Sequence, residues 1–167
     1  LSPVTPEFEA QLRGLLPAAA FKDSTPYVTE PRVRLQGLGF VVSPSSTAEV
    51  AIVVKACAEA RVGLVPYSGG TGSVCGQVMP DGPGLVVRTL DRMTRIRYVC
   101  PCENVLVCDA GVILADVQKA ADDVGRLFAL SLASEGSARI GGLLSTNAGG
   151  VNVLRYGNAR AQCLGLE

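Results

Sequence analysis

The stretch Ile140-Gly-Gly-Leu-Leu-Ser-Thr-Asn-Ala-Gly-Gly150 is the segment that best indicates the fold of this chain. Two Gly-Gly pairs bracket a segment in which small and polar residues follow two leucines. Glycine tolerates positive φ and places no Cβ between its N–H group and a ligand. Short hydroxyl and amide side chains add hydrogen-bonding groups without bulk. We therefore expect close main-chain contact with a large, flat, polar molecule here, and not an ordinary core helix.

A second glycine-rich segment follows a predicted strand. Leu64-Val-Pro-Tyr67 runs directly into Ser68-Gly-Gly-Thr-Gly-Ser-Val-Cys-Gly76. Successive N–H groups in such a turn form a concave nest for anionic oxygens, so a diphosphate could bind without a basic side chain. The segment matches neither the Walker loop, since Gln77 follows the glycine, nor the Rossmann loop, since no helix follows it. Alone it would suit a plain connection, but together with residues 140–150 it favours a ligand site.

The composition restricts the classes of function. The chain has 167 residues, of which 48% are hydrophobic and 18% charged, so part of its surface is expected to be covered by another domain or subunit. Its 15 basic and 15 acidic residues create no broad field for a polyanion, which argues against nucleic acid as a partner. The absence of histidine excludes catalytic triads, histidine-ligated metals and histidyl-linked flavins within this chain. No apolar run approaches membrane-spanning length.

The six cysteines form no Cys-x-x-Cys pair. Free thiols in a reducing compartment are the favoured interpretation, and a disulfide framework or a metal site remains the alternative. The chain begins at Leu1 and stops at Glu167 in the middle of a patterned segment. We therefore expect a piece of a longer protein.

The remaining pattern predicts helices and strands that alternate irregularly. Ser46 and Glu49 have the spacing of a capping box before a helix that should run to about Arg61 and end at Gly63. The other predicted helices cover residues 8–16 and 112–124, and the predicted strands cover residues 40–42, 64–67, 85–89, 96–99 and 105–108. This order favours an α+β fold of two lobes over a regular doubly wound sheet. We assign residues 1–39 to an N-terminal arm, 40–97 to the first lobe and 98–167 to the second.

Four ordered motifs resemble those of one enzyme family. Residues 66–78 resemble the pyrophosphate loop of the FAD-linked oxidases of the vanillyl-alcohol oxidase/p-cresol methylhydroxylase type. Ser134-Glu-Gly-Ser-Ala-Arg-Ile-Gly-Gly142 with Ser-Thr-Asn-Ala-Gly-Gly150, then Leu-Arg-Tyr-Gly157, then Leu-Gly-Leu-Glu167 follow in the order of that family. The resemblance covers about residues 40–167 and is strongest to the branch of D-2-hydroxyglutarate dehydrogenase, D-lactate dehydrogenase and the glycolate oxidase D-subunit.

The resemblance implies a two-lobed domain that binds FAD without a covalent bond. The pyrophosphate would be wrapped by Ser68, Gly69, Gly70, Thr71, Gly72, Ser73 and Gly76. The ribityl chain and the flavin side would be lined by Ser137, Ile140, Gly141, Gly142, Thr146, Asn147, Gly149 and Gly150.

The resemblance also implies an oxidoreductase that acts on a D-2-hydroxy acid such as D-lactate, glycolate or D-2-hydroxyglutarate. The substrate would be held by a C-terminal domain beyond this chain, so no catalytic or metal-ligating residue is assigned here and the chain alone should be inactive. Electrons would pass to a second acceptor that the sequence does not identify. The expected location is the cytoplasm, or the mitochondrial matrix in a eukaryote, and the sequence leaves a homo-oligomer open.

Several residues depart from the pattern of that family. Tyr67 and Ser68 stand where Arg or Gln and then Gly are frequent, Cys75 replaces a glycine, Ala129 stands where proline is common and Leu143 where asparagine is common. A left-handed backbone at position 75 would cost a cysteine roughly 1–2 kcal/mol. These departures keep a second hypothesis open, a non-catalytic binding or scaffold domain that keeps the fold with lost or weakened flavin binding.

Overall fold

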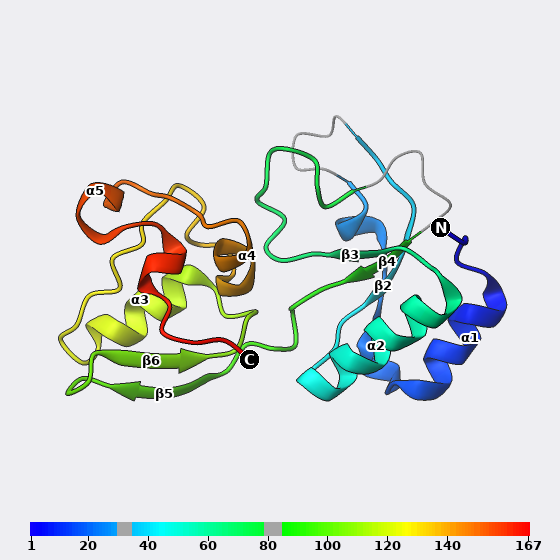
Figure 1. Cartoon of the computed structure of the whole chain (residues 1–167), viewed down its shortest axis with the longest axis horizontal. Helices are drawn as coiled ribbons and strands as arrows, with labels where there is room; N and C mark the ends of the chain where they lie inside the picture. Colours follow the sequence, from blue (N-terminus) through cyan, green and yellow to red (C-terminus); the bar gives the residue numbers. More distant parts are fainter. Residues whose placement is uncertain (30–34, 79–84) are drawn as a thin grey trace. The chain divides into compact units, whose positions relative to one another are not determined.

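The computed structural model describes residues 1–29, 35–78 and 85–167, and the chain divides into two compact units, Leu1–Met93 and Thr94–Glu167. Both units combine helices with a small sheet (Figure 1), which confirms the α+β prediction. Within the described ranges, no helix is both long enough and apolar enough to cross a membrane.

The first unit is built on a mixed sheet with the strand order β1-β2-β4-β3. β2 (Gly39–Val42), β4 (Leu85–Arg88) and β3 (Leu64–Pro66) run parallel, and the short β1 (Phe21–Lys22) pairs antiparallel with β2. Their register places Val42 and Pro66 on either side of Arg88. The carboxyl ends of the three parallel strands therefore meet at one edge of the sheet, the edge at which open α/β sheets bind ligands.

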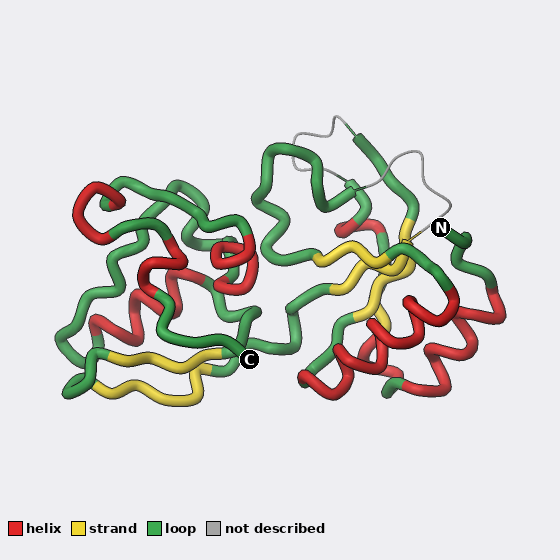
Figure 2. The backbone as a smooth tube through the Cα atoms, viewed as in Figure 1, coloured by secondary structure: helices red, strands yellow, loops and turns green. Residues whose placement is uncertain are grey.

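Helices α1 (Pro6–Leu15) and α2 (Thr47–Ala60) lie side by side against this sheet (Figure 2). Phe8 and Leu12, one helical turn apart on α1, are buried together with Val53 of α2 and Val42 and Val86 of the sheet. The described part of the expected N-terminal arm thus contributes α1, β1 and the short helix Ala18–Ala20 (η1) to the core. A second short helix, Thr25–Tyr27 (η2), follows and has no buried residue. Residues 30–34 of that arm lie outside the described ranges.

The ends of α2 differ in detail from the predicted capping. The Ser46 hydroxyl accepts a hydrogen bond from the Glu49 N–H at 3.2 Å, as a capping box requires. The Glu49 carboxylate, however, accepts from the N–H of Ser45 at 2.8 Å and not from that of Ser46. At the other end the left-handed position is occupied by Arg61, with φ of 57°, so the helix ends two residues before the predicted Gly63.

The second unit places helices on an antiparallel hairpin, β5 (Ile96–Cys100) and β6 (Val105–Cys108). The hairpin is followed by α3 (Leu114–Asp122), α4 (Ile140–Ser145), α5 (Val153–Tyr156) and the short helix η3 (Ala159–Gln162). Its core cluster consists of Leu114, Leu130, Ala138, Leu143 and Ala159. Residues 101–104 form the turn of the hairpin.

Asp109, directly after β6, is the one acidic residue of the described chain that is buried. Its carboxylate accepts from Arg97 Nε at 2.6 Å, from the Arg95 N–H at 3.1 Å and from Arg95 Nε at 3.3 Å. Burial alone would raise the pKa of Asp109, but these hydrogen bonds outweigh it and hold the pKa below its usual value. Asp109 is therefore a buried charge that joins both strands of the hairpin.

Candidate functional site

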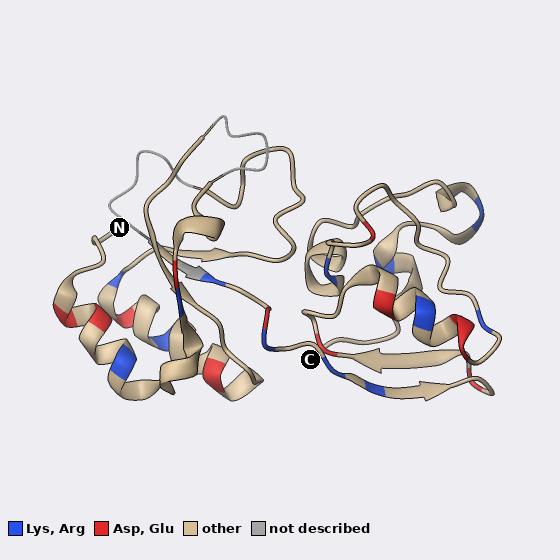
Figure 3. Ribbon diagram, turned by 180° about the vertical axis from the view of Figure 1, so that it is seen from behind, with Lys and Arg blue, Asp and Glu red and all other residues tan. Residues whose placement is uncertain are grey.

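The glycine-rich segment of the first unit leaves the sheet at its carboxyl edge. The Tyr67 N–H donates to the Arg88 carbonyl at 2.7 Å, which extends the pairing of β3 with β4 by one residue. From Ser68 the chain turns away without regular secondary structure as far as Val78. We call residues 68–76 the glycine loop. Figure 3 shows that it carries no charged residue, in agreement with the sequence.

The main chain of the glycine loop is bent by two residues with positive φ, Gly70 at 67° and Cys75 at 64°. The side-chain amide of Gln77 donates to the Gly72 carbonyl at 2.9 Å and to the Gly70 carbonyl at 3.4 Å. Gln77 therefore binds two of the carbonyl groups of the glycine loop. Among the described residues, no hydrogen bond uses the N–H groups of Ser68, Gly69, Gly70, Thr71, Gly72 and Gly76.

The side chain of Ser68 fits the same pattern. Its hydroxyl oxygen is buried and has no hydrogen-bond partner in the described part of the chain. An orphaned buried hydroxyl is costly, so a polar ligand or water is expected to complete it. The loop thus offers a set of unused donors and no competing carboxylate, which is the donor set that a diphosphate requires.

The second glycine-rich segment begins as a helix anchored in the core, although its sequence argued against an ordinary core helix. Residues 140–145 form α4, and the buried Leu143 anchors it in the core cluster. The N–H groups of Ile140 and Gly141 donate to the carbonyls of Val112 at 3.0 Å and Ala110 at 2.7 Å. These long-range bonds compensate for the low helix propensity of the Gly-Gly pair, and they also occupy two of the amides expected to face a ligand.

The polar side chains that follow α4 are largely bound within the segment. The Ser145 and Thr146 hydroxyls donate back to the Gly141 and Gly142 carbonyls at 2.6 and 3.0 Å. Asn147, with φ of 52°, accepts the N–H of Arg160 on its side-chain oxygen at 3.1 Å. Since these bonds use only one lone pair or proton each, the groups keep capacity for a further partner.

Three more expected ligand contacts lie around this segment. Ser137 is exposed and lies in a turn. Among the described residues, no hydrogen bond uses the N–H groups of Gly149 and Gly150. A Cβ at Gly150 would overlap the Ser131 carbonyl oxygen and lie 2.9 Å from its carbon. Gly150 is therefore required for close packing of two chain segments, whatever its role toward a ligand.

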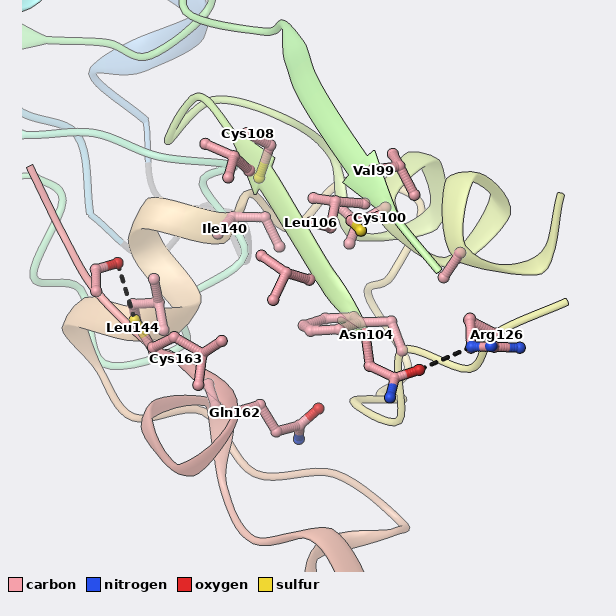
Figure 4. A pocket seen from close by; sticks show the side chains of 18 of the residues that line it. Val99, Cys100, Asn104, Leu106, Cys108, Arg126, Ile140, Leu144, Gln162 and Cys163 are labelled. Atoms are coloured by element: carbon pink, nitrogen blue, oxygen red, sulfur yellow. Dashed lines mark hydrogen bonds between the residues drawn. The ribbon is translucent and has the colours of Figure 1, made fainter. Parts of the chain in front are cut away.

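The second unit also contains a cavity that the sequence analysis missed. Its volume is about 830 Å³, and it is lined by β5, β6, α3, α4 and residues 162–167. Figure 4 shows Ile140 and Leu144 of α4 at this cavity together with Leu106 and Cys108 of β6. Burial raises the pKa of the Cys108 thiol, and the neighbouring Asp109 carboxylate raises it further. The unbroken apolar run of β6 was the one signal that both faces of this strand need cover.

The six cysteines are free thiols, and within the described residues no cluster of three or more His, Cys, Asp or Glu side chains could hold a metal ion. Cys57 is buried between α2 and the sheet, and burial raises its pKa to about 11. Such a thiol is protonated and unreactive near neutral pH.

A comparison with protein families shows which family contains these two glycine-rich segments. Residues 39–167 match the model of a family described as FAD binding domain. The match includes both glycine-rich segments, and it begins at the first residue of β2.

Curated relatives support the same assignment. The D-2-hydroxyglutarate–pyruvate transhydrogenase of Saccharomyces cerevisiae is 36% identical over 127 residues, which are 76% of this chain and 25% of that protein. The mitochondrial D-2-hydroxyglutarate dehydrogenase of Arabidopsis thaliana is 39% identical over 124 residues, 74% of this chain and 22% of that protein. The chain therefore spans about a quarter of the length of these relatives.

Solved structures show the fold at lower sequence identity. An alkyldihydroxyacetonephosphate synthase matches 98% of this chain and 32% of its own with a TM-score of 0.82 at 20% identity. A variant of Phl p 4 described as a glucose oxidase matches 91% of this chain and 34% of its own with a TM-score of 0.74 at 16% identity. The match to the FAD-binding domain model confirms the resemblance of the sequence motifs to FAD-linked oxidases, and the chain belongs to the FAD-binding domain family.

Proposed function

We propose that the glycine loop holds the diphosphate of a non-covalently bound FAD. The observation that carries this proposal is the row of unused N–H groups on an uncharged loop at the carboxyl ends of three parallel strands. The contacts would come from Ser68, Gly69, Gly70, Thr71, Gly72, Ser73 and Gly76. The Ser68 hydroxyl would donate to a phosphate oxygen and so gain the partner that it lacks within the described chain.

The second segment is proposed to line the ribityl chain and the flavin side. The residues concerned are Ser137, Ile140, Gly141, Gly142, Thr146, Asn147, Gly149 and Gly150. The N–H groups of Gly149 and Gly150 are available as donors, whereas those of Ile140 and Gly141 already bind Val112 and Ala110. Ile140 and Gly141 would therefore contribute shape and packing and not main-chain donors.

For the whole protein we propose a flavin-dependent dehydrogenase or oxidase of a D-2-hydroxy acid such as D-lactate, glycolate or D-2-hydroxyglutarate. Support comes from relatives named D-2-hydroxyglutarate dehydrogenase and D-lactate dehydrogenase. When bound, FAD supplies the redox chemistry, and the protein contributes binding and orientation. The substrate would bind to a further domain and the electrons would leave to a second acceptor. The cytoplasm, or the mitochondrial matrix in a eukaryote, is the proposed location, since several eukaryotic relatives are named mitochondrial.

Titration of the purified chain with FAD tests the binding proposal. We expect saturable quenching of flavin fluorescence and a rise of the melting temperature with FAD concentration. Ser68→Ala should weaken binding about tenfold to a hundredfold, because it removes one hydrogen bond to a charged group. The matched control is Ser24→Ala, a serine outside the loop whose side chain caps no helix. Absence of both quenching and a melting shift at saturating FAD would refute the proposal.

The chain alone is expected not to oxidise D-2-hydroxy acids even with FAD bound. It contains no histidine, and none of its residues is assigned as a base or as a substrate clamp. The check is the visible absorption of the bound flavin under anaerobic conditions after addition of D-lactate or D-2-hydroxyglutarate. Bleaching at an appreciable rate would show that this chain carries catalytic groups of its own.

The alternative, a scaffold domain that has lost the cofactor, receives support from one observation. Cys75 has the left-handed backbone that costs a non-glycine residue roughly 1–2 kcal/mol, so the loop carries strain that a glycine would relieve. Leu143 does not support the scaffold hypothesis, because this leucine is buried and packs in the core cluster of the second unit. The FAD titration distinguishes the two functions directly.

A further inference from the structure

Tyr67 stands at the start of the glycine loop, and its hydroxyl end lies directly over Gly70. A Cβ at Gly70 would overlap the Tyr67 Oη atom and would lie 2.8 Å from Cζ. Gly70 also has φ of 67°, a conformation that side-chain-bearing residues rarely adopt. Position 70 is therefore restricted to glycine for two separate reasons, and the Tyr67 ring occupies the space that any side chain there would need.

Tyr67 is itself held in place from two directions. Its N–H donates to the Arg88 carbonyl at 2.7 Å, which fixes its main chain to the central strand of the sheet. Its ring meets the ring of Tyr27 edge to face, with centroids 5.1 Å apart and planes at 78°. Such aromatic pairs stabilise a structure beyond the effect of the area that they bury. The contact with Tyr27 therefore holds the ring of Tyr67 in one position.

Tyr27 is in turn anchored by an acidic residue after β4. Its hydroxyl donates to Asp91 Oδ2, and Lys22 Nζ at the end of β1 donates to the same oxygen at 2.9 Å. The Asp91 carboxylate is mostly buried, with 13% of its side chain exposed, so this ion pair is better shielded than a surface pair. A continuous series of contacts therefore runs from Lys22 through Asp91 and Tyr27 to Tyr67 and Gly70.

We propose that Tyr67 is a positioning residue for the glycine loop. Tyr67 acts on the diphosphate through Gly70, and Tyr27, Asp91 and Lys22 hold Tyr67 in place. The contact narrows the conformations open to residues 69–72, and the Gln77 amide binds the Gly70 and Gly72 carbonyls within the same turn. The loop is thus ordered before the ligand arrives, which lowers the entropic cost of binding. This inference rests on the proposed FAD site.

The test is a double-mutant cycle on the chain described above, with the dissociation constant of FAD as the readout. Tyr67→Ala should weaken binding about tenfold, whereas Tyr67→Phe, which keeps the ring on Tyr27, should stay within about threefold of the parent. Gly70→Ala should weaken binding about a hundredfold in the parent but only about tenfold in the Tyr67→Ala background, where the overlap is relieved and the strained φ remains. The control is Tyr98→Ala, an exposed tyrosine of the second unit.

A second readout does not depend on FAD. Amide order parameters of Gly69, Gly70 and Gly72 in the FAD-free chain should fall in Tyr67→Ala and stay near the parent values in Tyr67→Phe. Equal loss of affinity for Gly70→Ala in both backgrounds, or unchanged order parameters in Tyr67→Ala, would overturn the role of Tyr67. Failure of the parent chain to bind FAD would instead overturn the proposed function, and the order parameters would still decide the inference.

Discussion

The two glycine-rich segments use glycine for different physical purposes. In the glycine loop, Gly70 supplies a positive φ and leaves main-chain amides without internal partners. In the second segment, Gly150 supplies close contact, because its Cα faces the Ser131 carbonyl, and most of the preceding amides already bind carbonyls of the second unit. Similar composition therefore produced an open set of donors in one unit and a packed turn of helix in the other.

One long polar side chain holds each segment, and the two differ in strength. Gln77 binds the Gly70 and Gly72 carbonyls with a neutral amide. Arg160 binds the Leu144 carbonyl through Nε at 2.8 Å and the Ser145 carbonyl through Nη2 at 2.7 Å, at the carboxyl end of α4. A charged donor at that end also interacts favourably with the helix dipole. We therefore expect substitutions in the second segment to affect stability and substitutions in the glycine loop to affect binding.

The largest effect is expected for Gly150→Ala. The added Cβ would overlap a main-chain oxygen of Ser131, which cannot move as a flexible side-chain end could. We expect a loss of about 3 kcal/mol in the free energy of unfolding, measured by urea denaturation. Gly136→Ala is the control, since a Cβ there meets nothing within 4 Å. Equal stability of the two variants would show that the contact at Gly150 is not tight.

The next effect is expected for Arg160→Ala. This change removes two charge-assisted hydrogen bonds to the last carbonyls of α4 and should lower the free energy of unfolding by about 1.5 kcal/mol. Arg155→Ala, whose guanidinium lies 5.2 Å from the Tyr156 ring centroid, is the comparison. If both arginine variants melt at the same temperature, the carboxyl end of α4 does not depend on Arg160.

In the glycine loop the expected effect shifts from stability to affinity. Gln77→Ala should weaken FAD binding about fivefold with little change in melting temperature, because it removes neutral hydrogen bonds from an exposed turn. Gln77→Glu should weaken it further, since a carboxylate cannot donate to the two carbonyls. Gln11→Ala on α1 is the matched control. A larger loss of stability than of affinity in Gln77→Ala would reverse the distinction between the segments.

The smallest effect is expected for Cys75→Gly. Relief of the left-handed strain contributes about 1 kcal/mol, and the greater freedom of glycine in the unfolded chain offsets most of it. We expect an unchanged or slightly higher melting temperature and an FAD affinity about twofold tighter. Cys75→Ala keeps the Cβ and should show no gain, which separates the backbone effect from the loss of the thiol. An equal gain in both variants would assign the effect to the sulfur.

The sequence predicted most of the first unit because its signals are local. The Ser46 cap and the strand before the glycine loop both depend on residues close together in the chain, and both appear where expected. The predicted extent of α2, to about Arg61, agrees with the structure within one residue, but the left-handed residue that ends the helix is Arg61 and not Gly63.

The features that the sequence did not predict depend on distant partners. α4 forms in spite of its Gly-Gly pair because Val112 and Ala110 supply acceptors for its first amides. No short sequence motif relates Tyr67 to Tyr27, whose rings are in contact. The same is true of Asp109 and the two arginines that bind it. The assignment of individual residues to FAD contacts stays a prediction. Its support is the set of N–H groups in the glycine loop that no hydrogen bond uses within the described residues.

The uncharged character of the glycine loop has a consequence for ionic conditions. Residues 64–78 contain no Lys, Arg, Asp or Glu, so any attraction for a diphosphate comes from peptide dipoles at contact distance. Mobile salt screens full charges over a Debye length of about 8 Å at physiological ionic strength, and it weakens short-range dipole contacts far less. A flavin held in this way should stay bound across dilute and concentrated salt, where a lysine-lined or arginine-lined site would release its ligand.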